Sequence, residues 1–130
     1  MALQKLAEFE LFFAALADKT RLRLLNLMRG GEVCVCFFAE TLDTNNPKVS
    51  RHLAYLKRAE LVAGRRDGKW MHYRLNKPPD PARAKILDDL FASFENDPEM
   101  QKDRKVLTKV CCAPPSPVQI GRTVRELAKQ

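Results

Sequence analysis

Four cysteines form two tight pairs in this chain of 130 residues, Cys34 with Cys36 and Cys111 with Cys112. Thiolates select soft or thiophilic ions. Trivalent arsenic and antimony take three sulfurs in a pyramid, or two when a carbon group fills one position, whereas zinc and cadmium prefer four sulfurs in a tetrahedron. Cysteines so close in sequence rarely bridge each other without strain, which argues against a disulfide framework. All four are therefore candidate ligands of a thiophilic ion.

The spacing of Cys34 and Cys36 sets a condition on binding one ion. On an α-helix, side chains two residues apart diverge by about 200° around the axis, whereas on extended backbone they point the same way. We therefore hypothesise that one ion binds both sulfurs only if the helix start around residues 34–36 unwinds. That distortion would then pass along the chain to the helix expected over residues 46–58.

Positive charge is concentrated in one segment of the chain. Residues 46–77 hold nine lysines and arginines against two acids, which accounts for the whole net charge of +7. A sequence pI of about 9.5 with charge localised in this way favours nucleic acid or an anionic surface as partner. No apolar run approaches the ~18 residues of a membrane span, and the N-terminus lacks a signal-peptide layout. We therefore expect a cytoplasmic protein.

The apolar pattern predicts a mainly α-helical chain with one small β-hairpin. Asp18 is a typical N-cap for the second helix, and Asn46 is expected to cap the fourth, with Pro47 at its first position. Asp67-Gly68 is a two-residue turn signal between two short strands. The predicted helices cover residues 3–16, 19–29, 36–43, 46–58, 81–96 and 99–110, and the predicted hairpin covers 61–75.

This order of elements predicts a winged helix-turn-helix. A helix with a polar, basic outer face fits the major groove, and cationic residues at a hairpin tip reach the neighbouring backbone or the minor groove. The alternative is a solvated basic face on a small helical protein, which the concentration of charge in one helix and hairpin disfavours. The candidate DNA-binding residues are Lys48, Ser50, Arg51, His52 and Tyr55 on the helix and Arg65, Arg66 and Lys69 on the hairpin.

The first and fifth helices carry more apolar surface than a small winged module covers by itself. Pairing these helices across a two-fold axis buries the surplus and presents two recognition helices to a pseudo-palindromic site. We therefore expect a homodimer with no membrane partner. Residues 1–96 would form the DNA-binding and dimerisation domain, and residues 97–130 an extension that carries Cys111 and Cys112.

Four segments together resemble the ArsR/SmtB family of metalloregulatory repressors, most closely its arsenic-responsive branch. They are ADKTRLRLL at residues 17–25, EVCVC at 32–36, PKVSRHLAYL at 47–56 and GKWMHYRL at 68–75. The resemblance implies a homodimeric winged helix-turn-helix that binds its operator when ion-free and releases it when the inducer binds. Classical arsenic sensors of this type carry a third cysteine where this chain has Ala39. The resemblance thus implies Cys34 and Cys36 as ligands, with Cys111 or Cys112, from either subunit, in place of the third.

The sequence and the resemblance together predict a transcriptional repressor, not an enzyme, that releases double-stranded operator DNA when As(III) or Sb(III) binds its thiolates. No permanently bound cofactor is expected. Two alternatives remain within the same fold: a repressor that responds to cadmium, lead or zinc through all four cysteines, and a switch in which oxidation of a cysteine pair replaces ion binding. A small reductase is disfavoured because the chain lacks a phosphate loop, a dinucleotide fingerprint and a Cys-x-x-Cys motif.

Overall fold

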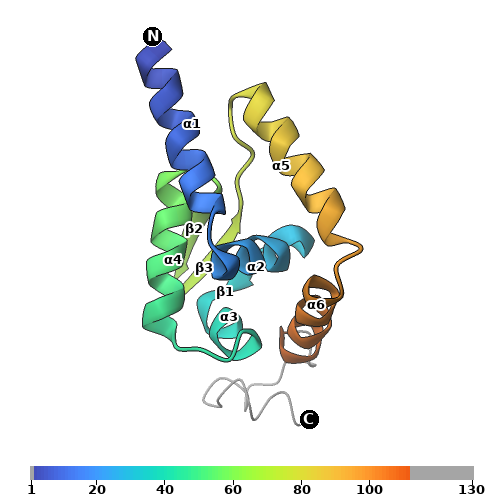
Figure 1. Ribbon diagram of the computed structural model, residues 1–130. Helices are drawn as coiled ribbons and strands as arrows, with labels where there is room; N and C mark the ends of the chain where they lie inside the picture. The colour runs from blue at the N-terminus through green and yellow to red at the C-terminus, as the bar shows by residue number, and fades with distance from the viewer. Residues whose placement is uncertain (1, 112–130) are drawn as a thin grey trace.

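The computed structural model describes residues 2–111, and these form a helical module around a small antiparallel sheet (Figure 1). The predicted order of helix, short helix, turn, basic helix and hairpin is present. The elements are α1 (Ala2–Leu16), α2 (Lys19–Leu27), the 3₁₀ turn η1 (Met28–Gly30), β1 (Val33–Cys34), α3 (Val35–Thr41), α4 (Asn46–Arg58), β2 (Val62–Asp67), β3 (Trp70–Leu75), α5 (Pro81–Phe94) and α6 (Pro98–Cys111).

Local capping signals fix where α2 and α4 begin. Asp18 caps α2 as predicted, because its side chain accepts a hydrogen bond from the backbone N–H of Arg21 at 3.0 Å. The cap of α4 is Asn45, whose side chain accepts from the backbone N–H of Lys48 at 3.0 Å. The prediction of Asn46 as the cap is wrong, because Asn45 has the extended backbone that a cap requires and Asn46 is already helical.

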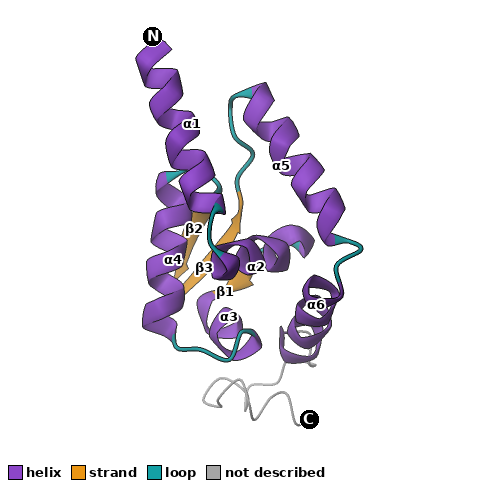
Figure 2. Cartoon of the chain, viewed as in Figure 1, coloured by secondary structure: helices purple, strands orange, loops and turns teal. Residues whose placement is uncertain are grey.

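The three strands pair in the order β1-β3-β2, so that β3 lies at the centre of the sheet (Figure 2). The β2–β3 register pairs Asp67 with Trp70, which places Gly68 and Lys69 in the turn, one residue later than the Asp67-Gly68 turn predicted. Gly68 takes a φ of 62°, which suits a residue without a Cβ. Strand β1 was not expected at all. It is only two residues long and pairs Cys34 with His72 of β3.

The core lies where α1 to α4 meet the sheet. The predicted inward face of α4, formed by Val49, Leu53 and Leu56, is fully buried. Phe12 of α1 and Phe38 of α3 are also fully buried and belong to the same cluster. At ~25 cal/mol per Å² of apolar surface removed from water, this burial is the main stabilising term for the module. Helix α4 is thereby fixed to its neighbours along one face, while Lys48, Ser50 and Arg51 on the other side remain exposed.

Helices α1 and α5 extend away from this module (Figure 1). Two large apolar side chains of α1, Leu6 and Phe13, remain exposed to solvent. The start of α5 is tied to α1 by the buried Arg83, whose Nη2 donates to Oε2 of Glu8 at 3.4 Å. None of the described helices has the length and apolar content that a bilayer span requires.

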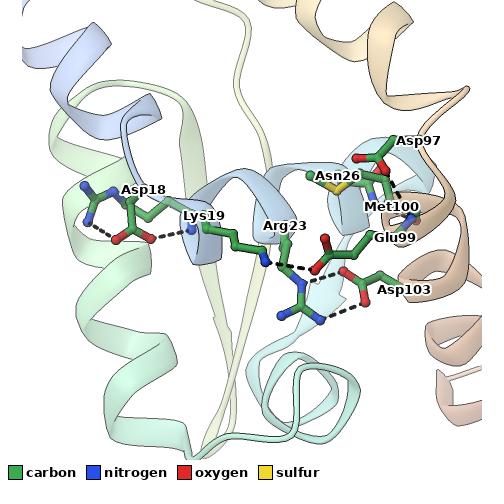
Figure 3. A network of polar contacts seen from close by, with 9 residues as sticks. Asp18, Lys19, Arg23, Asn26, Asp97, Glu99, Met100 and Asp103 are labelled. Atoms are coloured by element: carbon green, nitrogen blue, oxygen red, sulfur yellow. Dashed lines mark hydrogen bonds and ion pairs between the residues drawn. The ribbon is translucent and has the colours of Figure 1, made fainter.

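Helix α6 packs against α2 and α3 and brings a polar network with it (Figure 3). Arg23 donates from Nε and Nη2 to the two oxygens of Asp103 at 2.7 and 2.9 Å. The amide of Asn26 donates to the backbone carbonyl of Met100 at 2.9 Å. Leu107 adds an apolar contact with the common core. The helix predicted over residues 99–110 thus exists as α6 and lies on the same core as the module.

Candidate inducer site and nucleic-acid interface

Cys34 lies at the junction of β1 and α3. It is the N-cap residue of α3, with φ −71° and ψ 143°, and it also ends β1. Cys36 follows in the first turn of α3. Since Cys34 has extended backbone, the rule that places residues i and i+2 on opposite sides of a helix does not apply to this pair. The two side chains can therefore point the same way without any change of backbone.

The two sulfurs are already adjacent in the folded chain. Sγ of Cys36 donates to Sγ of Cys34 across 3.3 Å. Our expectation that the helix start must unwind before one ion binds both cysteines is therefore wrong. Two sulfurs each about 2.3 Å from one centre lie ~3.3 Å apart when the bonds meet at a right angle, and ~3.8 Å apart at the tetrahedral angle. The spacing thus fits a pyramidal trivalent centre more closely than a tetrahedral one.

The contact between the two sulfurs also shifts the pKa values of the two thiols in opposite directions. The hydrogen bond from Cys36 lowers the pKa of Cys34 to about 6, against the opposing effect of burial, and His72 across the strand pair contributes in the same direction. The hydrogen bond to Cys34 and burial raise the pKa of the Cys36 thiol. The pair therefore loses its first proton easily and shares the second, which leaves one thiolate available as a nucleophile or ligand.

A third protein ligand is not assembled around the pair among residues 5–110, whose side chains the structure describes: no three His, Cys, Asp or Glu side chains there form a metal-binding group. Cys111 is the last residue of α6, and its side chain, like the whole of Cys112, lies outside the described part of the chain. The backbone of α6 nevertheless passes close to the site. Arg104, Leu107 and Thr108 line a cavity of about 170 Å³ together with residues 30–33, directly before Cys34.

The outer face of α4 divides the predicted DNA-binding residues into two groups. Lys48, Ser50 and Arg51 are exposed. His52 and Tyr55 are only partly exposed because both contact Arg21 of α2. The Nδ1 atom of His52 lies 3.3 Å from Arg21 Nη1, and the Tyr55 ring centre lies 4.2 Å from Arg21 Cζ. The structure thus brings the first group toward solvent and turns the second toward α2.

The hairpin formed by β2 and β3, which we call the wing, presents Arg66 and Lys69 to solvent as predicted from its basic tip. Arg65 is exposed as well, but its Nη2 lies 2.6 Å from Oε1 of Glu32. That contact lowers the pKa of Glu32 and connects the wing to the residue two positions before Cys34. The cysteine pair is therefore linked to the wing twice, through the β1–β3 pairing and through this ion pair.

Sequence reasoning missed the contribution of Arg21 to this interface. Its Nε and Nη2 donate to the carbonyls of Ala15 and Ala14 at 2.8 and 3.1 Å, at the C-terminal end of α1. The Ala14 carbonyl also accepts from the backbone N–H of Ala17 at 3.2 Å, so Arg21 adds a second donor there, and its charge is favourable at the negative end of the helix dipole. Together with the contacts to His52 and Tyr55, this makes Arg21 the junction of α1, α2 and the recognition helix. An arginine three residues after a capping aspartate gives no local signal of that role.

Comparison with known proteins agrees with this geometry. The profile described as "Bacterial regulatory protein, arsR family" matches residues 18–63. The "Arsenical resistance operon repressor" of Escherichia coli K12 is 49% identical over 81 residues, which are 61% of this chain and 68% of that protein. Against two arsenic resistance regulators of Pseudomonas putida, the chain spans 51% and 56% of their lengths.

Two solved structures bear on the fold. A crystal structure of the "AntR antimony-specific transcriptional repressor" is 31% identical, covers 72% of this chain and 82% of its own, and gives a TM-score of 0.55. The NMR structure of a homodimeric winged helix-turn-helix domain from Mycobacterium bovis, a possible ArsR-family regulator, is 28% identical, with 72% and 86% coverage and a TM-score of 0.59. The predicted winged helix-turn-helix is confirmed, as is the expectation of a regulator and not an enzyme. This chain belongs to the ArsR family of bacterial transcriptional regulators.

Proposed function

We propose that this chain is a cytoplasmic repressor that releases operator DNA when trivalent arsenic or antimony binds Cys34 and Cys36. The observation that carries the proposal is the sulfur–sulfur distance of 3.3 Å at a site joined to the wing. The chemistry matches, since thiolates select thiophilic ions and a right-angled pair of bonds needs about this spacing. The printed names of arsenic and antimony regulators among the similar proteins point the same way.

The DNA-binding half of the proposal rests on the exposed basic residues of α4 and the wing. Lys48, Ser50 and Arg51 would contact the major groove and its flanking phosphates, while Arg66 and Lys69 would contact the adjacent backbone. His52 and Tyr55 remain candidates, through the atoms that do not face Arg21. Lys and Arg contacts displace counterions, so operator affinity should fall steeply as salt rises.

A homodimer would complete the DNA reader. Leu6 and Phe13 of α1 are 65% and 49% exposed, which is a large exposure for apolar side chains on one helix. Burial of this face against a second copy removes it from water and presents two recognition helices to two half-sites. The described homodimeric state of the Mycobacterium bovis domain supports this arrangement.

The third coordination position is proposed to come from Cys111 or Cys112. Arg104, Leu107 and Thr108 of α6 share a cavity lining with residues 30–33, and Cys111 follows Thr108 by about one helical turn. A thiolate from this end of the same subunit would therefore approach the cysteine pair from α6. A trivalent arsenical whose third position is a methyl group needs only Cys34 and Cys36, so the two cysteine pairs should differ in importance between inorganic and methylated inducers.

Release would follow from the shared sheet. Binding at Cys34 acts on a residue that pairs with His72 in β3, and β3 is also the central strand of the wing. At the same time Cys36 belongs to α3, which packs against α4. An inducer that binds one arrangement of β1 and α3 more tightly therefore favours the arrangement of wing and α4 that goes with it. No unwinding of α3 is required.

The test is release of labelled operator duplex titrated with arsenite, methylarsenite, antimonite, cadmium and zinc under reducing conditions. It should be run on wild type, on Cys34→Ser/Cys36→Ser and on Cys111→Ser/Cys112→Ser. We expect arsenite and antimonite to release wild type, and the first variant to stay bound with every ion. Release of that variant by arsenite would refute the site. Release by cadmium or zinc alone would instead assign a four-cysteine sensor, and release only without reductant a redox switch.

A further inference from the structure

A polar pocket of about 310 Å³ opens between the first turn of α2, the α3–α4 connection and the first turn of α4. Its polar lining consists of Thr20, Arg23, Thr44, Lys48 and His52, together with two apolar side chains below them. Lys48 and His52 belong to the predicted DNA-binding residues of α4, whereas Thr20, Arg23 and Thr44 lie on α2 and on the α3–α4 connection. Among the described residues that line this pocket, none is an aspartate or a glutamate.

The orientation of Arg23 makes this pocket a donor site. Its Nε and Nη2 are engaged side-on by Asp103, so Nη1 stays outside that pair (Figure 3). Asp103 is almost fully buried, which fixes the guanidinium plane from the α6 side. The hydrogen bonds to Asp103 raise the pKa of Arg23, so its positive charge is retained. An oriented guanidinium with a remaining N–H group is well suited to an oxyanion.

The other polar side chains add donors of matching kind. Lys48 contributes a second full positive charge, and the two threonines contribute hydroxyls. Nδ1 of His52 lies 3.3 Å from Nη1 of Arg21, which leaves Nε2 as the other polar atom of this ring. Three acids lie near the pocket, and each has a cationic or backbone partner: Asp103 accepts from Arg23, Glu99 pairs with Lys19 at 3.4 Å, and Asp18 caps α2. Oδ1 of Asp18 also lies 3.9 Å from Nδ1 of His52, so we leave His52 out of the proposed donor set.

We propose that this pocket binds one backbone phosphate of the operator in each subunit, with Arg23, Lys48 and the hydroxyls of Thr20 and Thr44 as donors. The inference rests on the proposed DNA-binding function and adds α2 and the α3–α4 connection to the interface. Phosphate contacts of this kind set the register of a recognition helix on the duplex. The pocket adjoins the exposed start of α4, which is where the strand flanking the major groove must pass if Ser50 and Arg51 reach base edges.

The test measures affinity against salt for a fluorescent duplex selected from a random library by the wild-type protein. Arg23→Gln/Asp103→Asn removes both partners of the ion pair, so net charge is unchanged and no buried carboxylate is left alone. We expect the slope of log affinity against log salt to fall by about 0.9 per subunit. Arg104→Gln is the matched control for loss of an exposed arginine outside this pocket, and its slope change should be much smaller. Thr44→Val should weaken binding a few-fold without changing the slope.

A second arm locates the phosphate. Single methylphosphonate replacements along the duplex should weaken the wild type at one position per half-site where they no longer weaken the Arg23→Gln/Asp103→Asn variant. If the wild type binds the duplex and the variant keeps its slope and its methylphosphonate pattern, the pocket proposal is overturned while the repressor proposal stands. Failure to select any duplex would instead overturn the repressor proposal. Saturable binding of inorganic phosphate in NMR titrations at constant ionic strength, with an unchanged DNA slope, would assign the pocket to a free anion and also overturn it.

Discussion

Replacing Arg21 with methionine should loosen the recognition helix from the rest of the protein. The guanidinium contacts two carbonyls at the end of α1, Nδ1 of His52 and the ring of Tyr55, and its side chain is only 12% exposed. Methionine keeps most of the apolar stem and removes these polar contacts together. The substitution therefore isolates what the guanidinium contributes to the junction of α1, α2 and α4.

The magnitude follows from those contacts. Two hydrogen bonds from a cation are worth about 1.5 kcal/mol each, at the lower end of their range. The cation–π contact with Tyr55 adds about 0.5 kcal/mol. We expect Arg21→Met to lower the free energy of unfolding by roughly 3.5 kcal/mol, which for a chain of this size lowers Tm by roughly 10 °C. Operator affinity should fall as well, because α4 loses the contacts of His52 and Tyr55 with the Arg21 guanidinium.

The assay is urea unfolding followed by circular dichroism, at one protein concentration because subunit association contributes to apparent stability. Arg51→Met is the matched control, since it removes the same group from an exposed position on α4. Exposed substitutions of this kind change stability by less than ~0.5 kcal/mol. An Arg21→Met protein as stable as the Arg51→Met protein would refute the assignment of Arg21 as a structural junction.

Three further predictions concern the cysteine pair and the wing. Alkylation of Cys34 by iodoacetamide, followed by mass spectrometry, should show a midpoint near pH 6, because hydrogen bonding lowers its pKa to about 6, and Cys36→Ala should move the midpoint upward. A midpoint unaffected by Cys36→Ala would contradict this. Gly64→Val should lower the free energy of unfolding by about 1–3 kcal/mol in thermal unfolding, because an added Cβ would lie 3.0 Å from the Tyr73 ring. Unchanged stability would show that the wing backbone moves to accommodate the side chain. Glu32→Gln removes the carboxylate that pairs with Arg65 of the wing, so affinity for non-specific duplex should rise a few-fold in anisotropy titrations. An unchanged affinity would show that Arg65 does not contact DNA.

Local signals predicted most of the helical frame. Proline and asparagine at residues 45–47 marked the start of α4 within one residue, and the apolar positions of α4 identified its buried face. The glycine at residue 68 located the wing turn within one residue. These features depend on a few neighbouring residues, whose backbone preferences are strong enough to be read from the sequence.

The features that sequence reasoning missed depend on contacts between distant segments. Strand β1 is two residues long and exists because β3, some forty residues later, supplies its hydrogen-bonding partners. That pairing makes Cys34 extended, and so reverses the expected divergence of the two sulfurs. The orientation of Arg23 depends on Asp103, 80 residues away, and the orientation of His52 depends on Arg21. Neither pairing leaves a spacing or composition that marks it.

The two-residue strand has a consequence for how such sensors diversify. A β-bridge of this length requires backbone hydrogen bonding at residues 33 and 34 and places little demand on the side chain that residue 34 presents. Exchange of that side chain, or of the one at residue 36, would alter which chemical signal is detected while leaving the route to the wing intact. Under the proposed function, substitutions at residues 34 and 36 can therefore change the inducer without changing the residues that contact DNA.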